Sequence, residues 1–291
     1  MAVTPSAEQS ASTDSNESVS EAANMEDVPT QSRSADPCAS CGLCCRSYLV
    51  PVFGHDVYHL VKRRGLDPRS FLFICEQEAA DPVGFLLEAE GPTYGLALDK
   101  KNALEVNQPC VFLVENADGT SRCGVYEDRP IACMTYPMAR ATDGVSFLPN
   151  ALCPPGAWTP AEPGNEHWAL SLRRLARYRD TYVEVVRRWN AWIASTPRRS
   201  PPAEHFVAYV LQTFDRLATL DAEIGGRELE AIERLWGTVG RDAPREGALE
   251  QEPSWMTYFR RARATIDEFF PGVPALPFAR LSVVIDQTPG P

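Results

Sequence analysis

Four cysteines near the N-terminus indicate the chemistry of this chain. They lie in the block Cys38-Ala-Ser-Cys41-Gly-Leu-Cys44-Cys45-Arg46. Two successive C-x2-C steps let several thiolates converge on one metal centre, and Gly42 permits the tight turn that this convergence needs. Adjacent side chains in extended backbone point apart, so one tetrahedral ion rarely takes both Cys44 and Cys45. The adjacent pair therefore suggests two metal sites, or one site and a cysteine with another role.

The other cysteines continue along the first half of the chain. The nine are Cys38, Cys41, Cys44, Cys45, Cys75, Cys110, Cys123, Cys133 and Cys153. A secreted disulfide scaffold is normally short, with an even number of cysteines and a signal peptide. This chain is long, the number is odd, and the start lacks the basic and apolar stretches of a signal peptide. We expect a cytoplasmic protein in which every cysteine except Cys75 binds metal, with Cys75 a buried structural thiol in an apolar stretch.

The spacing of the first three cysteines favours an iron–sulfur cluster. Cys38, Cys41 and Cys44 match the first three ligands of the ferredoxin run C-x2-C-x2-C-x3-C-P, but Tyr48 stands where the local fourth ligand would be. A remote Cys-Pro supplies that ligand in two-cluster ferredoxins, and Cys153-Pro154 is the only such pair in the sequence. One interpretation thus divides the ligands into Cys38, Cys41, Cys44 and Cys153 for one centre and Cys45, Cys110, Cys123 and Cys133 for another. Ligand type alone permits an iron–sulfur cluster, of the 4Fe–4S kind, or zinc.

A zinc finger is a competing interpretation. The spacing Cys38-x2-Cys41-x13-His55-x3-His59 fits the C2H2 pattern. That pattern leaves Cys44 and Cys45 unused, and Pro51 and Gly54 interrupt it. His55 and His59 form an i,i+4 pair, for which partial metal ligation is the alternative role; we expect both to be surface residues on a short helix.

Three segments together carry a recognisable motif. They are Cys38-x2-Cys41-Gly42-x-Cys44-Cys45-Arg46, then Pro109-Cys110-x-Phe112-Leu113, then Cys123-x2-Tyr126-Glu127-x-Arg129-Pro130-x2-Cys133-x2-Tyr136-Pro137. Over about residues 38–153 the chain resembles the YkgJ-type CxxCxxCC cysteine-cluster family. The resemblance implies a zinc- or iron-chelating or iron–sulfur-cluster domain, and the same cysteine cluster recurs in flagellin lysine N-methylases. Met134 departs from the pattern, because many members have Arg directly after the last motif cysteine.

Cations are expected beside the thiolates. Four thiolates around a divalent ion leave a net charge of about −2, which nearby positive groups stabilise. Arg46 and Arg129 are placed to do this, and a surface ion pair is the alternative role for each. Tyr126 and Tyr136 are expected to pack around the centre.

The sequence divides into three regions. Residues 1–36 hold seven acids, one base and no aromatic residue; such a segment buries too little apolar surface to offset the entropy of ordering, so we expect disorder. Residues 37–160 form the cysteine-cluster domain, whose metal centre we expect to hold it together. Residues 161–291 form a helical region. The predicted fold class is α+β, mostly α, with short helices and a hairpin in the metal-binding domain.

Local signals place the elements of the metal-binding domain. Asp56 is a predicted cap for a helix over Val57–Arg64, and Asp67-Pro68 starts another predicted helix that runs through Ile74. Strands are expected over Tyr94–Leu98 and Cys110–Val114. The second strand leads into a hairpin turn, Asn116-Ala117-Asp118-Gly119, that closes on Cys123. A helix from Pro130 would place Cys133 about one turn inside it.

Apolar spacing of three and four residues predicts the later helices. They are expected over residues 166–194, around Phe206–Leu217, over Glu228–Trp236 and over Trp255–Phe270. The aromatic stripe of the first of these is expected to be helical core. A basic group on it is interpreted as a solvated surface and comprises Arg173, Arg174, Arg177, Arg187 and Arg188.

Composition narrows the function. The net charge of −11 argues against nucleic-acid binding, and the sequence has no apolar run of 18 residues that would cross a membrane. No hydrolase elbow, phosphate loop or dinucleotide fingerprint occurs. Three hypotheses remain: an iron–sulfur protein for electron transfer or support of another enzyme, a structural zinc module whose helical region binds a protein partner, and, from the resemblance alone, a relative of protein lysine N-methylases.

Overall fold

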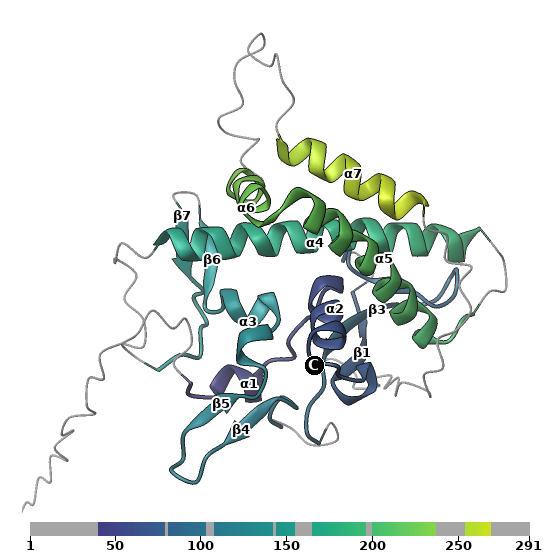
Figure 1. Ribbon diagram of the computed structural model, residues 1–291. Helices are drawn as coiled ribbons and strands as arrows, with labels where there is room; N and C mark the ends of the chain where they lie inside the picture. The colour runs from purple at the N-terminus through teal and green to yellow at the C-terminus, as the bar shows by residue number, and fades with distance from the viewer. Residues whose placement is uncertain are drawn as a thin grey trace, which may run out of the picture. The chain divides into compact units, whose positions relative to one another are not determined.

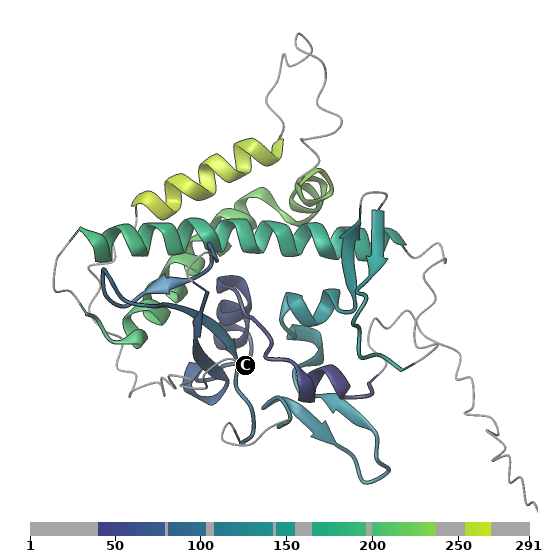
Figure 2. The ribbon, with the colours of Figure 1, turned by 180° about the vertical axis from the view of Figure 1, so that it is seen from behind.

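A long helix, α4 (Asn165–Ala194), organises the part of the chain that the structure describes. The computed structural model describes residues 40–78, 81–102, 108–141, 144–154, 165–195, 200–236 and 254–268. In Figures 1 and 2, α4 runs between the cysteine-bearing elements on one side and α6 and α7 on the other. The predicted disordered tail, 1–36, lies outside the described residues.

The other helices are mostly amphipathic and pack through their apolar faces. They are α1 (Leu43–Ser47), α2 (Gly54–Lys62), α3 (Ile131–Thr135), α5 (Ala203–Ile224), α6 (Gly226–Leu235) and α7 (Ser254–Glu268), with 3-10 turns η1 (Pro68–Ser70) and η2 (Tyr126–Asp128). The later helices are confirmed, but α5 begins three residues before and ends seven residues after the predicted Phe206–Leu217. Residues 269–270 of the last prediction lie outside the described part. No helix within that part combines the length and the apolar character that crossing a bilayer requires.

Three small antiparallel sheets complete the architecture. The strands are β1 (Leu72–Gln77), β2 (Phe85–Leu86), β3 (Thr93–Leu98), β4 (Leu113–Glu115), β5 (Ser121–Cys123), β6 (Met138–Ala141) and β7 (Gly144–Phe147). The first sheet has the order β1-β3-β2, and the others are the hairpins β4-β5 and β6-β7. The predicted α+β fold, mostly α, is therefore confirmed, including the hairpin that closes on Cys123.

The segment after Asp67 corrects a prediction. Asp67 does cap a turn, because its carboxylate accepts a hydrogen bond from Arg69 N at 3.0 Å, but the turn is only the short η1. The apolar residues that follow form strand β1 instead of a helix, with Leu72 opposite Leu98 and Ile74 opposite Leu96 of β3. Burial alternates over Leu72–Cys75 with the period of two of a half-covered strand, and the end of β1 is more exposed. The apolar run was ambiguous because its strand partner lies more than 20 residues away.

Helix α2 also begins earlier than predicted. Its N-cap is Phe53, and Asp56 is the third helical residue, whose carboxylate accepts a hydrogen bond from Phe53 N at 2.8 Å. Gly65, the expected stop, does adopt a left-handed conformation (φ 68°) beyond the end of the helix. The capping group was therefore identified, but its position in the helix was wrong by one turn.

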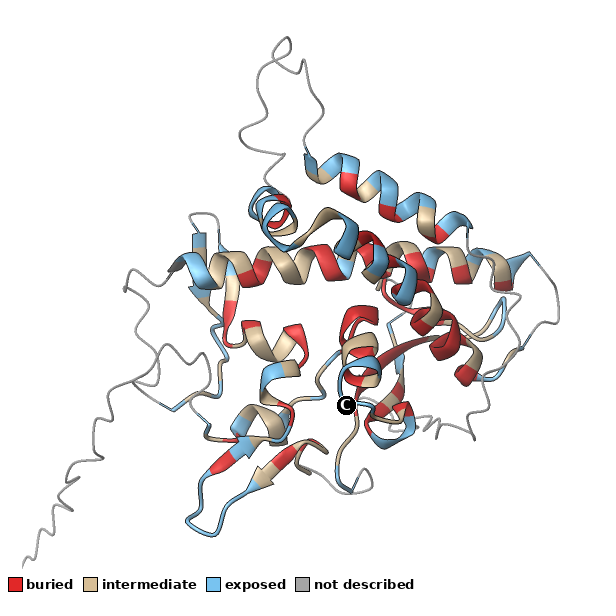
Figure 3. Ribbon diagram, viewed as in Figure 1, coloured by how far each residue is buried: buried red, intermediate tan, exposed pale blue. Residues whose placement is uncertain are grey.

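One hydrophobic core joins the cysteine-bearing elements to the helices. Buried side chains of α2 and the first sheet, such as Leu60 and Ile74, belong to the same cluster as Trp189 of α4 and Phe214 of α5. Figure 3 shows buried positions along α2, α4 and α5 where these helices meet. The expected helical core of residues 166–194 is thus confirmed. The predicted division near residue 160 falls in 155–164, outside the described residues, and stays a prediction.

Arg177 is a further correction, because it belongs to this interior. Its side chain is 1% exposed and donates to Glu233 (Nε–Oε1 3.0 Å) and to the hydroxyl of Tyr258 (2.8 Å), and it pairs with Asp221 at 3.3 Å. These partners lie on α6, α7 and α5, so one guanidinium ties three helices to α4. The basic group on α4 is therefore not uniformly solvated, although Arg187 is exposed as expected.

Candidate metal centre

Seven cysteines line a single cavity. They are Cys41, Cys44, Cys45, Cys110, Cys123, Cys133 and Cys153. The cavity holds about 70 Å³, whereas one water molecule needs roughly 10–15 Å³ on the same measure. None of these seven cysteines forms a disulfide, and Cys38 lies outside the described residues. The structure therefore brings together seven of the eight predicted ligands, from segments more than 100 residues apart in the chain.

Helix α1 places Cys44 and Cys45 on the cavity. Gly42 precedes the helix with φ 71°, and a Cβ atom there would lie 3.0 Å from Ser121 Oγ of β5. The left-handed backbone favours glycine, and a Cβ atom would in addition displace the Ser121 side chain by a few tenths of an ångström. The expectation that adjacent cysteines point apart assumed extended backbone. In the structure both lie in a helical turn, and both line the cavity.

Backbone contacts fix the cysteines that come later in the chain. Cys110 N donates to Cys45 O at 2.8 Å, which joins the first cysteine block to the segment before β4. Cys123 ends β5 opposite Leu113 in the predicted hairpin. Cys133 lies in α3, which begins after Pro130 as expected, so its thiol position depends on how that short helix is held.

A buried carboxylate holds α3. Asp56 of α2 is 4% exposed, and its Oδ1 accepts a hydrogen bond from Ile131 N at 2.9 Å, while Oδ2 accepts from Phe53 N. Asp56 therefore caps two helices at once, since the first N–H groups of a helix have no partner within it. Burial raises the pKa of Asp56 to about 7, and the two backbone hydrogen bonds only partly oppose this.

Four of the thiols interact electrostatically. Burial raises the pKa of Cys110 to about 11, and the negative charges of Cys45 and Cys123 add to this rise. The pKa of Cys133 is raised well above its ordinary value by burial and by the charges of Cys110, Cys45 and Cys123. These four thiols cannot all ionise together without added positive charge, which a metal ion supplies. They are also the second group of four in the ligand division suggested by the sequence, which stays a prediction.

Cys45 differs from Cys110 and Cys133 in the direction of its pKa shift. A hydrogen bond with the Cys44 side chain lowers the pKa of Cys45 to about 7, against the effect of burial, and the charges of Lys100 and Arg46 lower it further. Cys45 thus presents a thiolate more readily than Cys110 or Cys133. Cys153 interacts electrostatically with Tyr136. Burial is the main cause that raises the pKa of Tyr136, and the charge of Cys153 adds to this rise.

The thiols line the cavity wall, but their sulfur atoms do not converge on one point. Among the described residues, no three side chains of His, Cys, Asp or Glu are close enough to hold one ion. Each cysteine has a single side-chain torsion, so ligation would need these sulfurs to turn inward. The donor set itself, thiolates around a cavity with apolar walls, is the chemistry that zinc and iron–sulfur centres use.

Comparison with protein families agrees with this donor set. Residues 37–154 match the family model CxxCxxCC, described as "Putative zinc- or iron-chelating domain". We call this segment the CxxCxxCC domain, after the model that it matches. No curated protein and no solved structure matches the chain significantly. The CxxCxxCC domain thus supports metal binding as the general role of this half of the chain.

Arg129 brings a buried cation to the CxxCxxCC domain. Its side chain lines the cavity, is 9% exposed and stacks its guanidinium 3.8 Å from the ring centre of Tyr126. It donates to Tyr126 O at 3.2 Å, but Nε has no hydrogen-bond partner within the described part of the chain. A buried cation needs a compensating negative group, which a thiolate-bound metal would provide. Tyr126 and Tyr136 also line the cavity.

The other two cations near the cysteines have different settings. Arg46 forms an ion pair with Glu115 of β4, which is the surface alternative considered for it, although its charge still reaches Cys45. Lys100 was not identified from the sequence. It follows β3 and lies close enough to Cys45 and Cys110 to interact with their charges. No local signal distinguished it from Lys101, because its role depends on contacts with residues more than 50 positions away.

The histidines of the zinc-finger interpretation do not reach the cavity. His55 is 5% exposed, and its ring stacks on Tyr178 of α4 with 3.8 Å between centroids. The prediction that His55 is a surface residue is therefore wrong, because α2 turns this side chain toward α4 and α5. Burial lowers the pKa of His55 and also that of His59, which is only half-buried.

Cys75 lies on β1. Its side chain is half-buried and does not line the cavity either.

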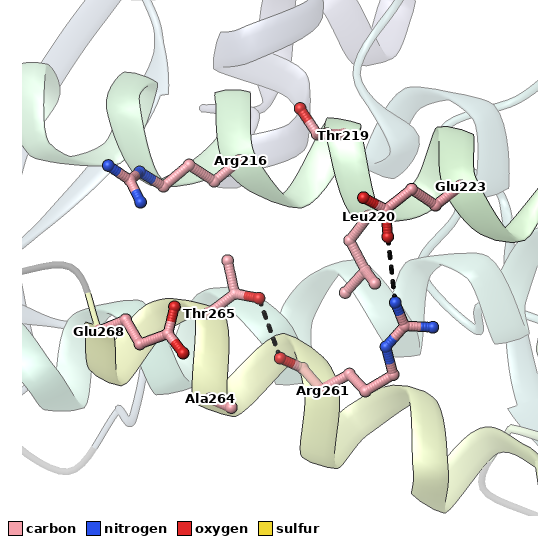
Figure 4. A pocket seen from close by; sticks show the side chains of 8 residues that line it. All are labelled: Arg216, Thr219, Leu220, Glu223, Arg261, Ala264, Thr265 and Glu268. Atoms are coloured by element: carbon pink, nitrogen blue, oxygen red, sulfur yellow. Dashed lines mark hydrogen bonds and ion pairs between the residues drawn. The ribbon is translucent and has the colours of Figure 1, made fainter.

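A second hollow lies between α5 and α7 and has a different character. It measures about 280 Å³. Figure 4 shows the ion pair between Arg261 of α7 and Glu223 of α5 beside Leu220, with Thr265 donating to the backbone of its own helix. No cysteine or histidine lines it. Its charged groups join two helices, so the metal chemistry belongs to the cysteine cavity.

Proposed function

We propose that the CxxCxxCC domain holds an iron–sulfur cluster, of the 4Fe–4S kind, and uses it for electron transfer or to support the chemistry of another enzyme. The observation that carries this proposal is the gathering of thiols around one cavity, among them Cys41 and Cys44 of the ferredoxin-like run. Seven thiols line the cavity, whereas one 4Fe–4S cluster or one structural zinc ion takes four, and the ferredoxin-like spacing favours the cluster. Iron–sulfur clusters are held by cysteine thiolates, and the eighth predicted ligand, Cys38, would come from the segment directly before the first described residue.

The walls of the cavity support the same proposal. Val50, Leu98, Phe112 and Leu113 line it together with the cysteines. Apolar walls limit solvent access, and both burial and nearby charge tune the reduction potential of a cluster. Arg129 and Lys100 supply positive charge where a thiolate-bound cluster would be negative. When bound, the cluster would accept or release single electrons, and these residues would hold it and offset its charge.

Zinc is the second candidate. Four thiols whose charges affect one another, Cys45, Cys110, Cys123 and Cys133, match the number in a structural zinc site. Under this alternative the helical region would present a surface to a protein partner. We place both candidates in the cytoplasm, where reduced thiols bind metals.

Anaerobic purification tests the two candidates. A cluster gives a brown protein with thiolate-to-iron charge-transfer absorption, iron and acid-labile sulfide in similar amounts, and a reversible one-electron reduction. A colourless protein with stoichiometric zinc and no sulfide would overturn the cluster and support the second candidate. A cluster that takes up no electron in a potentiometric titration would exclude electron transfer and leave the supporting role.

A matched pair of variants links the result to the cavity. Cys110→Ser removes a thiol that lines it, whereas Cys75→Ser removes a half-buried thiol that does not. The first variant should lose the metal or convert its spectrum, and the second should match the wild type. Equal metal contents would contradict the assignment of the site.

A further inference from the structure

Lys100 lies where the first cysteine block meets Cys110. It follows β3 and forms an isolated antiparallel bridge with Cys110. Its ammonium group donates to three carbonyl oxygens, those of Cys45 at 2.9 Å, Arg46 at 3.3 Å and Tyr48 at 2.7 Å. An ammonium group has three N–H donors, so these contacts use all of them.

These carbonyls belong to the C-terminal end of α1. The last carbonyls of a helix have no partner within it, and a cation there stabilises the helix. Helix α1 has only five residues, which is too short to be stable by itself. Cys45 O also accepts the hydrogen bond from Cys110 N, so one carbonyl connects Cys45, Cys110 and Lys100. The position of both α1 cysteines relative to Cys110 therefore depends on this side chain.

The charge of Lys100 acts on the same thiols. The group is half-buried, and it interacts with the charges of Cys45, Cys110, Cys44 and Cys133. Because its N–H groups are occupied by carbonyls, Lys100 affects the sulfurs through charge and position without binding them. This distinguishes it from Arg46, whose charge is shared with Glu115.

We propose that Lys100 is the positioning residue of the metal centre: it holds α1 so that Cys44 and Cys45 face Cys110, and it offsets part of the negative charge of the bound thiolates. This inference rests on metal binding by the cavity, for either zinc or an iron–sulfur cluster.

The test compares Lys100→Met with Lys101→Met. Lys101 is the adjacent residue, and its ammonium donates to Leu113 O at 2.5 Å, so the control loses a similar lysine–carbonyl contact that does not involve α1. Metal content is measured first; a wild-type protein that binds no metal refutes the proposed function itself. The rate of metal loss to excess chelator is then followed. We expect Lys100→Met to lose metal about tenfold faster than wild type, as residues that orient ligands commonly do, and Lys101→Met to match wild type.

Conservative variants separate positioning by a cation from a general effect on folding. Lys100→Arg keeps the charge and should recover most of the metal retention, whereas neutral Lys100→Gln should not. With a cluster, the reduction potential of Lys100→Gln should fall below that of Lys100→Arg, because loss of positive charge favours the oxidised state. If Lys100→Met does not fold, the Arg and Gln variants decide. Equal retention in these two, or equal loss in Lys100→Met and Lys101→Met, would overturn the inference.

Discussion

Gly54 offers a direct test of how the CxxCxxCC domain meets the helices. It is the first residue of α2, and a Cβ atom there would lie 1.9 Å from Cε2 of Phe214 on α5. That is well inside the contact distance of about 3.5 Å between carbon atoms. Phe214 is 1% exposed, so its ring cannot move aside into solvent. Gly54→Ala must therefore push α2 and α5 apart.

The size of the effect follows from two opposing contributions. Overpacking of a filled core typically costs about 1–3 kcal/mol. Replacement of glycine by alanine recovers about 0.4–1 kcal/mol by restricting the unfolded chain. Gly226 provides the matched control, since it begins α6 and a Cβ atom there meets nothing within 4 Å. We expect Gly54→Ala to be less stable than Gly226→Ala by about 1–3 kcal/mol, a shift of roughly 2–4 °C in Tm per kcal/mol.

Thermal unfolding followed by far-UV circular dichroism measures this difference. A second readout is metal loss to chelator, because α2 carries Asp56, which caps the helix of Cys133. Gly54→Ala should lose metal faster than wild type, and Gly226→Ala should not. If both variants melt at the same temperature, the close approach of α2 to Phe214 is not as described. If only stability changes, the connection from α2 to the metal centre is refuted.

Three further predictions address the site and the interior. Cys133→Ser should lose metal by atomic absorption while keeping its helical circular dichroism, whereas Cys75→Ser should keep both; loss of metal in both variants would contradict the site. Burial raises the pKa of Asp56 from its ordinary value of 3.8 to about 7 in the folded chain. The folded chain therefore binds the carboxyl proton more tightly than the unfolded chain does, and the stability that this proton contributes is lost as the pH rises toward 7. In the metal-free protein, the urea concentration at the unfolding midpoint should decrease between pH 5 and pH 8, and Asp56→Asn should reduce this decrease. The same pH dependence in the variant and the wild type would disprove the assignment. Arg177→Met should cost about 3–5 kcal/mol in calorimetry because Glu233 stays buried without its main partner, and Glu233→Leu in addition should restore most of it; no restoration would refute the pairing.

The sequence predicted elements whose signals are local. The apolar spacing of residues 166–194 needs no partner to indicate a helix, and α4 follows it closely. The turn at Asn116–Gly119 determined the β4-β5 hairpin, and Pro130 marked the start of α3. The convergence of distant cysteines was expected from the chemistry of thiolates, and the cavity brings seven of them together.

The features that sequence reasoning missed depend on long-range contacts. Strand β1 is a strand because β3 pairs with it, and nothing within the six residues shows this. Arg177 is buried because Asp221 and Glu233, 44 and 56 residues later, face it. His55 was predicted to be a surface residue because its helix is short. The packing of α2 against α4 and α5 buries its side chain instead. Lys100 gains its role in the same way, from carbonyl groups of α1.

The shared apolar core has a consequence for how the protein acquires its metal. Most of that core consists of side chains that an ion would never touch, and it ties α2 and the first sheet to the long helices. We therefore expect α2 and the first sheet to keep their fold when no metal is bound, because this core supports them. Removal of metal would then loosen α1, the β4-β5 hairpin and α3, which is a narrower role than the expected one of holding all of residues 37–160 together.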